Sequence, residues 1–347
     1  MAPVKTALLS FGMSGKIFHA PFIDLHPGFQ LAGSWERSQK NIQSIYPNTR
    51  SYQSFEEILE DPTIDLVVVN TPTNSHFDYA KKVLLAGKHA IVEKAFTTTV
   101  SEAIELKELA EKVGKKLAVY QNRRYDSDFR TMQRIIKSGV LGRLVDAEFH
   151  YDRYKPLIGP KLHKETPGPG AGLLNDLGPH LIDQAICLFG MPKQLYADIR
   201  VIRDNSKVDD WFSIVFHYPD LRVTLKSSNI CREHVPAFAL NGVNGSFLKS
   251  MADVQENALL RGEKPNFDDW GLQPDSERGL LHAEKDGVEI KERVPTERGN
   301  YYDFFDGVYN AIKNDTEMPV TADDGINVMK ILDAAVRSNE SKKLVQI

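Results

Sequence analysis

The chain has 347 residues, which at roughly 100–200 residues per domain predicts two domains. Its 26% of charged residues and formal net charge of -4 argue against disorder and against a nucleic-acid-binding protein, which usually carries a basic excess. The chain has two cysteines, Cys187 and Cys231, so neither a disulfide framework nor a thiolate zinc site is predicted. The sequence contains no membrane-type apolar run and no secretory leader, so no membrane partner is expected. Together these features predict a cytoplasmic protein.

Residues 1–122 alternate short apolar runs with segments of helical pattern. The run at residues 65–70 is continuously apolar between its end residues, as in a strand buried on both faces of a parallel sheet. Thr99 and Glu102 match a capping box, which predicts a helix that ends at Gly114. Strands are predicted over residues 4–11, 29–35, 65–70, 89–93 and 117–120, and further helices over 16–25 and 75–86. This alternation predicts an α/β fold that begins with a doubly wound parallel sheet of the Rossmann type.

Residues 123–347 have a different pattern, with β-rich stretches separated by short turns. This spacing predicts an antiparallel sheet. A segment between residues 155 and 172 contains four prolines and four glycines and is predicted to be a long loop, which in compact domains is often functional. Strands are predicted over residues 145–154, 195–202, 211–218 and 221–226, with helices over 129–136 and around 328–335, the latter after a cap at Thr321 and Asp324.

A glycine-containing turn at residues 10–15 joins the first strand to the first helix. Such a turn lets backbone N–H groups approach a dinucleotide pyrophosphate, although an ordinary strand–turn–helix junction is the alternative. Glu36, about 20 residues further on, suits the ribose hydroxyls of NAD and repels the 2′-phosphate of NADP. Arg37 and Ser38 suit that phosphate instead, so NAD is favoured while NADP stays open. The predicted cofactor-binding residues of this region are Phe11, Gly12, Met13, Ser14, Gly15, Glu36 and Arg37.

Polar residues also follow two later strands, at the edge where parallel sheets bind their ligands. Lys94 comes directly after the strand at residues 89–93. A lysine there can hydrogen-bond a substrate hydroxyl and stabilise charge that develops on its oxygen, whereas a solvated strand-end lysine is the alternative. We predict that Lys94 is catalytic. The remaining predicted cofactor-binding residues are Thr71, Pro72, Asn74, His76, Glu93, Lys94 and Asn122.

Asp176 and His180 form the second candidate catalytic group. Gly178 suits a chain turn and Pro179 suits the first turn of a helix, which is predicted to begin near Asp176. In such a helix, Asp176 and His180 lie one turn apart on one face. The carboxylate can orient the imidazole, and histidine titrates near neutrality, as a general base for an alcohol must. The alternative is a capping aspartate beside a buried structural histidine. No H-E-x-x-H spacing occurs, so no metal site is predicted.

Taken in order along the chain, these motifs resemble the Gfo/Idh/MocA family of oxidoreductases, in particular its scyllo-inositol dehydrogenase-like branch. The resemblance implies a Rossmann domain over residues 1–122, and a substrate-binding and oligomerisation domain over 123–347 with a large, mostly antiparallel open sheet. It also implies a homodimer or homotetramer. The stretches that carry it are GMSGKIFHAP (12–21), QNRRYDSDF (121–129), DRYKP (152–156), NDLGPHLIDQ (175–184) and PVTADDGIN (319–327).

The same resemblance assigns Lys94, Asp176 and His180 as the catalytic set. Ser10 and Ala95 depart from the family pattern, which has glycine and proline at these positions. The predicted function is hydride transfer between a cyclitol or sugar hydroxyl and the nicotinamide of NAD(P). Alternatives are a non-catalytic NAD(P)-sensing regulator and an NAD-dependent glycosidase of the same fold. The predicted substrate-binding residues are Lys94, Arg124, Arg153, Tyr154, His163, Asp176 and His180, and Asn122 is a further polyol-binding candidate.

Overall fold

The structure, a computed structural model, describes residues 2–36, 40–160 and 162–347 and divides into two compact units. The first unit comprises Met1–Asn122, Gln255–Trp270 and Asn300–Ile326, and the remaining segments form the second. The first change of unit coincides with the boundary predicted at residue 122. Residues 255–270 and 300–326 pack with the first unit, although the sequence pattern placed them in the second domain. The assignment of substrate binding and oligomerisation to the second domain stays a prediction.

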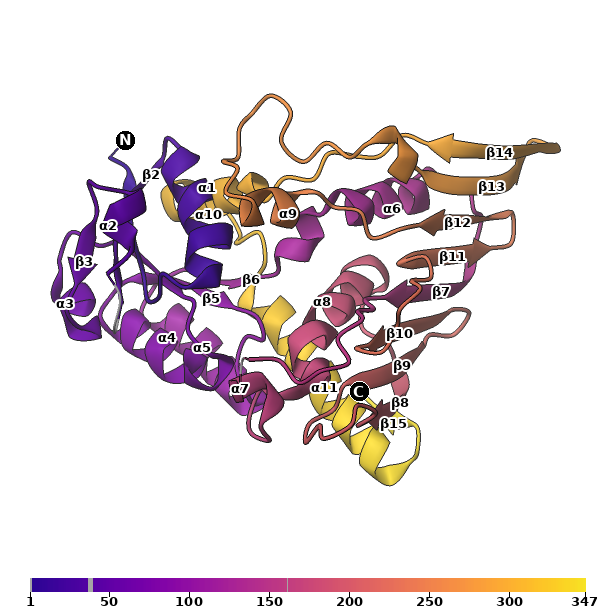
Figure 1. The fold of residues 1–347 in the computed structure, drawn as a ribbon, viewed down its shortest axis with the longest axis horizontal. Coiled ribbons are helices and arrows are strands. Elements are labelled where there is room, and N and C mark those ends of the chain that lie inside the picture. The colour runs from indigo at the N-terminus through magenta and orange to yellow at the C-terminus, as the bar shows by residue number, and fades with distance from the viewer. Residues whose placement is uncertain (1, 37–39, 161) are drawn as a thin grey trace. The chain divides into compact units, whose positions relative to one another are not determined.

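Six parallel strands form the sheet of the first unit, in the order β3-β2-β1-β4-β5-β6. Figure 1 labels four of them, β2, β3, β5 and β6. This is the strand order of a Rossmann fold, so the predicted fold class is confirmed. The order reverses beside β1, and ligands of such sheets bind at the carboxyl ends of the strands next to this switch point. The strands are β1 (Val4–Leu8), β2 (Phe29–Trp35), β3 (Arg50–Tyr52), β4 (Leu66–Val69), β5 (His89–Glu93) and β6 (Leu117–Tyr120).

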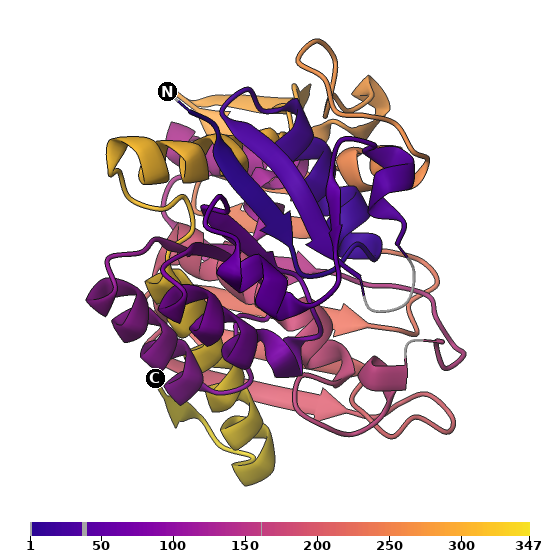
Figure 2. The same cartoon turned by 90° about the vertical axis from the view of Figure 1, so that its left-hand side faces the viewer.

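Helices pack beside this sheet, and Figure 2 shows them with its strands in the foreground. Phe22 and Phe305 stack with ring centroids 5.8 Å apart, which is how a late segment of the chain completes the first unit's core. The predicted capping box is confirmed, because the N–H of Glu102 donates to Thr99 Oγ1 and the N–H of Thr99 donates to the Glu102 carboxylate. The helical segments are η1 (Gly15–His19), α1 (Ala20–Leu25), α2 (Ile42–Ile45), α3 (Phe55–Glu60), η2 (Thr73–Ser75), α4 (His76–Leu85), α5 (Val100–Lys112), α9 (Gln255–Leu260) and α10 (Tyr302–Asn314).

Nine strands form the sheet of the second unit, in the order β14-β13-β12-β11-β7-β10-β9-β8-β15. Of the strand pairs described in this sheet, β7–β10 is parallel and the others are antiparallel, as the family resemblance implies. The strands are β7 (Leu144–His150), β8 (Gln194–Arg200), β9 (Trp211–His217), β10 (Arg222–Ser228), β11 (Phe238–Gly242), β12 (Gly245–Lys249), β13 (Gly279–Lys285), β14 (Val288–Val294) and β15 (Val345–Gln346).

Alternate residues of the central strands point to one buried face of this sheet. Phe212, Ile214 and Phe216 of β9 are fully buried, whereas the residues between them are partly exposed. Helix α8 packs against β9 and β10. The helices are η3 (Asn122–Tyr125), α6 (Ser127–Ser138), α7 (Leu162–Glu165), α8 (Gly172–Phe189), η4 (Asp275–Glu277) and α11 (Ala322–Ser341), whose residues after Ile326 belong to this unit.

Helix α8 begins at Gly172, so the prediction that it begins near Asp176 is wrong. The N–H of Leu173 donates to the carbonyl oxygen of Asp209 at 2.8 Å, and the N–H of Leu174 donates to its Oδ2 at 2.6 Å. These two bonds satisfy N–H groups that the first turn of a helix leaves without a partner. The early start therefore depends on a residue that lies far along the chain.

Gly178 and Pro179 lie inside this helix and not at its start, which corrects their predicted roles. A Cβ at Gly178 would lie 3.2 Å from Leu174 Cδ1 and 3.4 Å from Leu332 Cδ2. Leu332 belongs to α11, so Gly178 permits close packing of α8 and α11 within the second unit. The glycine that the sequence suggested as a turn residue is a packing residue.

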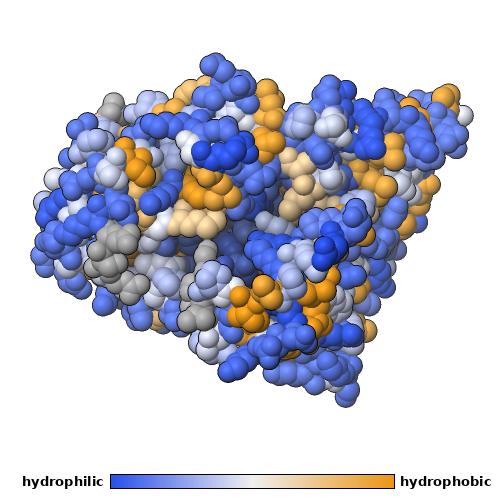
Figure 3. All heavy atoms as spheres, in the orientation of Figure 1, coloured by the Kyte–Doolittle hydropathy of each residue, from blue (hydrophilic) through white to orange (hydrophobic). Residues whose placement is uncertain are grey.

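The side chains on the face shown in Figure 3 are mostly hydrophilic, with smaller hydrophobic areas between them. None of the described helices combines the length and the apolar character that a membrane span needs. Neither Cys187 nor Cys231 forms a disulfide bond.

Candidate functional site

The turn after β1 is fixed by its own residues and by the end of β4. Asn70 Nδ2 donates to the carbonyl oxygen of Ser10 at 2.8 Å, and the N–H of Gly12 donates to Ser10 Oγ at 3.2 Å. A Cβ at Gly15 would lie 2.3 Å from that carbonyl oxygen, so the close approach requires glycine there. Ser10 does not take a left-handed conformation, which explains why a serine is tolerated where the family pattern has glycine.

Glu93 links this turn to the end of β5. One carboxylate oxygen accepts a hydrogen bond from the Ser14 hydroxyl and lies 2.9 Å from Nε2 of His19, and the other accepts from the N–H of Lys94 at 3.2 Å. Burial raises the pKa of the Glu93 carboxyl, but hydrogen bonds and charges from His19, Ser14 and Lys94 outweigh it and lower the pKa to about 2. Glu93 is therefore ionised at neutral pH and fastens the glycine turn to the end of β5, directly before Lys94.

His19 belongs to this network, although it is not among the predicted site residues. Its side chain is fully buried, and its ring lies 4.4 Å from the ring of Tyr120, centroid to centroid. The position next to a glycine turn was the sequence signal, but a histidine there is equally suited to packing. The structure gives His19 both a packing contact and a polar partner.

Glu36 directly follows β2, as predicted. Its two carboxylate oxygens accept hydrogen bonds from the N–H groups of Asn41 at 2.9 Å and Ile42 at 3.1 Å. Each carboxylate oxygen can accept more than one hydrogen bond, so ribose hydroxyls can still bind there. Arg37 lies outside the described residues, and the assignment of Glu36 to the ribose stays a prediction.

The loop after β4 exposes Pro72 and Asn74 and half-buries Thr71. His76 is buried in contrast, and its two ring nitrogens each lie 2.8 Å from a carbonyl oxygen, one of Thr71 and one of Ala95. Burial lowers the pKa of His76, and the two carbonyl groups oppose that shift. The ring thus braces the loops after β4 and β5, and its predicted contact with a cofactor stays a prediction.

The first unit has the features that a dinucleotide requires. Gly12 and Met13 are exposed at the tip of the turn, at the carboxyl end of β1 and beside the switch point. Phe11 packs its buried ring edge-on against Tyr46, so its side chain belongs to the core. Backbone N–H groups of the turn would hold the pyrophosphate, with Glu36 at the ribose. The residues present therefore fit an NAD(P) cofactor.

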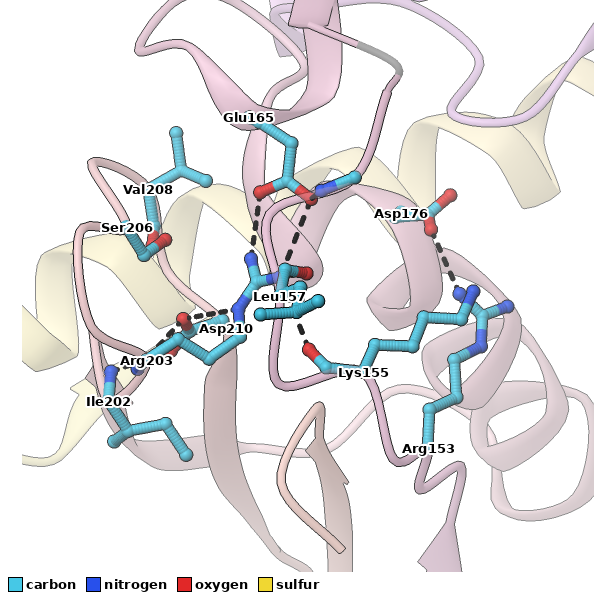
Figure 4. A network of polar contacts seen from close by, with 11 residues as sticks. Arg153, Lys155, Leu157, Glu165, Asp176, Ile202, Arg203, Ser206, Val208 and Asp210 are labelled. Atoms are coloured by element: carbon cyan, nitrogen blue, oxygen red, sulfur yellow. Dashed lines mark hydrogen bonds and ion pairs between the residues drawn. The ribbon is translucent and has the colours of Figure 1, made fainter.

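In the second unit, Asp176 lies between two cationic side chains. Lys164 Nζ donates to its Oδ1 at 2.5 Å. Arg153 Nη1 donates to its Oδ2 at 3.3 Å, the contact drawn in Figure 4. The three residues come from α7, from the segment after β7 and from α8. Charge-assisted hydrogen bonds on both oxygens hold the carboxylate in one orientation.

His180 lies one helical turn after Asp176 on α8, so the predicted spacing is present. Its side chain is 6% exposed, and its ring centroid lies 6.4 Å from that of Tyr151. Such a buried imidazole beside an oriented carboxylate can exchange a proton with a bound alcohol. The catalytic roles of both residues stay predictions.

Arg124 and Tyr154, which were predicted to bind substrate, have other partners within the second unit. Arg124 donates two hydrogen bonds of 2.7 Å to the carboxylate of Asp183, a buried residue of α8. The Tyr154 hydroxyl accepts from Arg232 Nη2 at 2.5 Å. Arg124 therefore braces η3 against α8, and only Arg153 of these predicted residues is brought to Asp176.

The structure says less about the two remaining predicted site residues, His163 and Asn122. The side chain of His163 lies outside the described part of α7. Asn122 is buried, with 5% of its surface exposed, and closes the first segment of the first unit. Within the described residues, no group of three or more histidine, cysteine, aspartate or glutamate side chains could hold a metal ion.

Lys164 is a site residue that the sequence did not identify. Its loop was predicted to be functional because of its prolines and glycines, but nothing in that composition selects one residue. The sequence holds a second signal, that of buried charges in need of partners. The adjacent acids Asp209 and Asp210 precede an apolar strand, and charges before a buried strand need polar partners. Both acids are engaged, as described below.

Comparisons with known proteins agree with this architecture. Residues 4–121 match the NAD-binding Rossmann fold domain of the Gfo/Idh/MocA oxidoreductase family, and residues 133–347 match its C-terminal alpha/beta domain. The scyllo-inositol 2-dehydrogenase (NADP(+)) IolW of Bacillus subtilis is 33% identical over 99% of this chain and 96% of that protein.

Two further relatives cover the whole chain. An uncharacterized oxidoreductase of Schizosaccharomyces pombe, C115.03, is 40% identical over 100% of both chains. The crystal structure of a putative oxidoreductase from Bacteroides fragilis has a TM-score of 0.92 and 44% identity over 99% of this chain and 100% of that one. With both family domains matched in order, this chain belongs to the Gfo/Idh/MocA family of oxidoreductases.

Proposed function

We propose that this oxidoreductase is an NAD(P)-dependent dehydrogenase that acts on a hydroxyl of a cyclitol or sugar. The observation that carries the proposal is the pair of Asp176 and His180 on one face of α8, with the Asp176 carboxylate oriented by two cations. Lys94 directly after β5 and the glycine turn after β1 complete the set of groups that such a reaction needs. The name of IolW supports a polyol as the substrate class.

In the proposed oxidation, His180 accepts the proton of the substrate hydroxyl. Lys94 donates a hydrogen bond to the same oxygen and stabilises the negative charge that develops on it. Asp176 accepts hydrogen bonds from neighbouring hydroxyls or orients His180. A bound dinucleotide would supply the acceptor for the hydride that leaves the carbinol carbon of the substrate. Proton transfer of this kind contributes about 10²–10⁴-fold to the rate, so no metal ion is needed in the proposal.

Cofactor preference follows from opposing arguments. The negative charge of Glu36 at the end of β2 favours NAD over NADP, because it repels a 2′-phosphate. The name of IolW, in contrast, carries NADP(+). We propose NAD, and both cofactors belong in the assay.

The test is a panel of scyllo-inositol, myo-inositol and common sugars, assayed with NAD and with NADP by the absorbance of the reduced cofactor. Turnover of a polyol or sugar supports the proposal. Dinucleotide binding without turnover across the panel would indicate a cofactor-sensing regulator. Release of free sugar from aryl glycosides without net cofactor reduction would indicate a glycosidase.

We also propose a homodimer or homotetramer, as the family resemblance implies, and a cytoplasmic location, as the presence of only two cysteines indicates. The open face of the second unit's sheet supports a subunit contact, because it exposes Tyr196 of β8 beside Val215 of β9. Light scattering after size exclusion measures the oligomeric state, and a monomer at micromolar concentration would contradict this part of the proposal.

A further inference from the structure

Arg203 is a buried arginine that joins three parts of the second unit (Figure 4). Its side chain is 2% exposed, and Nε donates to Oδ2 of Asp210 at 2.8 Å. Nη2 donates to Oε2 of Glu165 at 2.7 Å, and Nη1 donates to the carbonyl oxygen of Leu157 at 3.1 Å. The planar guanidinium thus binds two carboxylates and a backbone carbonyl at once, through three nitrogens held in a fixed geometry.

The segment that Arg203 holds is the one that carries Lys164. Glu165 also makes a hydrogen bond within this segment, because its Oε1 accepts the N–H of Gly159 at 3.1 Å. Lys164 is the neighbour of Glu165 in α7, and its Nζ lies 2.5 Å from Asp176. We refer to Arg203, Glu165 and Asp210 as the loop clamp.

Asp209, the residue before the clamp's Asp210, holds the start of α8. Asp209 accepts the N–H groups of Leu173 and Leu174 at the start of α8, the helix of Asp176. A Cβ at Gly172 would lie 1.9 Å from Asp209 Oδ1, so the helix start and this carboxylate are in direct contact. Two adjacent acids therefore fix both elements, the α7 loop through Arg203 and α8 through its first N–H groups.

We propose that Lys164 is a further substrate-binding residue and that Arg203 is the positioning residue that sets it against Asp176. This inference rests on the proposed function, since it assigns Lys164 to the polyol site. Lys164 is 39% exposed, so its Nζ can exchange part of its contact with Asp176 for a substrate hydroxyl. Arg203 is buried and reaches substrate only through the loop that it holds.

The test compares K164M, R203M and the K164M/R203M double variant with the wild-type protein on the best substrate of the polyol panel. K164M is expected to raise KM about tenfold, because a hydrogen bond to a charged group is lost, with kcat changed by less than about twofold. R203M is expected to raise KM to a similar extent. If Arg203 acts through Lys164, the double variant is no worse than K164M within about twofold.

The control is R200M, which removes a surface arginine that is paired with Asp198 in the same part of the sheet. Its KM is expected to stay at the wild-type value. If the losses of K164M and R203M multiply to about a hundredfold in the double variant, the positioning role is wrong. An unchanged KM in K164M would overturn the substrate-binding role of Lys164.

E165Q keeps the shape of the clamp and removes one charge, so it serves if R203M does not fold. It is expected to raise KM about threefold and to accelerate backbone hydrogen exchange over residues 155–160 and 162–165 without affecting 172–189. Wild-type exchange and wild-type KM in E165Q would contradict the proposal. Hydrogen exchange needs no substrate, so the clamp can fail or hold independently of whether the wild-type protein turns over any polyol.

Discussion

Glu93 in the first unit and Asp176 in the second are both carboxylates that organise a candidate half-site, but they are held in different ways. Glu93 is 13% exposed and is bound by a hydroxyl and an imidazole from the segment after β1 and by the backbone N–H of the residue after β5. Asp176 is held between two long cationic side chains, one of them on a loop that needs its own buried clamp.

The difference follows from topology. The carboxyl ends of parallel strands meet at one edge, so the partners of Glu93 come together as soon as the sheet forms. The partners of Asp176 come from a proline-rich loop and must be ordered against chain entropy by additional contacts. We expect the first half-site to tolerate little change and the second to be adjustable among substrates.

The largest expected effect is on the chemistry of the second half-site. H180A should lower kcat about 10²–10⁴-fold, because the general base is removed. The affinity for dinucleotide, measured by fluorescence titration, should stay at the wild-type value since the first unit is unchanged. H282A, which removes an exposed histidine of β13, is the control. Undiminished turnover in H180A would contradict the assignment of the base.

The next largest effect is expected on dinucleotide binding in the first unit. E93Q should raise the Kd for dinucleotide about tenfold, because the charged hydrogen bonds that fasten the glycine turn are lost. Fluorescence of the reduced cofactor measures this Kd. E105Q, which removes an exposed carboxylate paired with Lys81, should have no effect. A wild-type Kd in E93Q would show that the turn is held without Glu93.

A smaller effect concerns cofactor choice. E36Q should shift the ratio of kcat/KM for NADP over that for NAD upward by about fivefold, since one repulsive charge near a 2′-phosphate is removed. Initial rates with each cofactor measure the ratio, and E60Q in the exposed end of α3 is the control. An unchanged ratio would place the discriminating residue elsewhere.

The smallest effect is a pH dependence of stability at the start of α8. Burial and the neighbouring charge of Asp210 raise the pKa of Asp209 to about 6, although the N–H groups of the helix oppose the shift. An aspartate whose pKa is raised in the folded state binds a proton there before it does so in the unfolded chain. Its contribution to stability is therefore present at low pH and is lost as pH rises through about 6.

Between pH 5 and 7.5, the wild-type free energy of unfolding should fall by about 1 kcal/mol relative to D209N, which has no such group to titrate. Urea titrations at each pH measure the difference, with D220N in an exposed turn as the control. Parallel pH profiles for D209N and the wild-type protein would contradict the raised pKa.

Much of the first unit could be predicted because its signals are local. The apolar run of β4 and the Thr99–Glu102 box each depend on neighbours within a few residues. The late strands of the second unit were missed because their pattern is weak. β11 and β12 are short and contain glycine, and β14 alternates charges on an exposed edge.

By itself, the sequence determined the family, the Rossmann topology and the chemical identities of Lys94, Asp176 and His180. Only the tertiary structure decided which partners hold the charged residues around them. His19 meets Glu93 across 74 residues and Arg203 meets Glu165 across 38, and no periodicity or capping rule reaches that far. Local patterns report the backbone state of a segment, whereas the partner of a buried charge depends on which segments pack together.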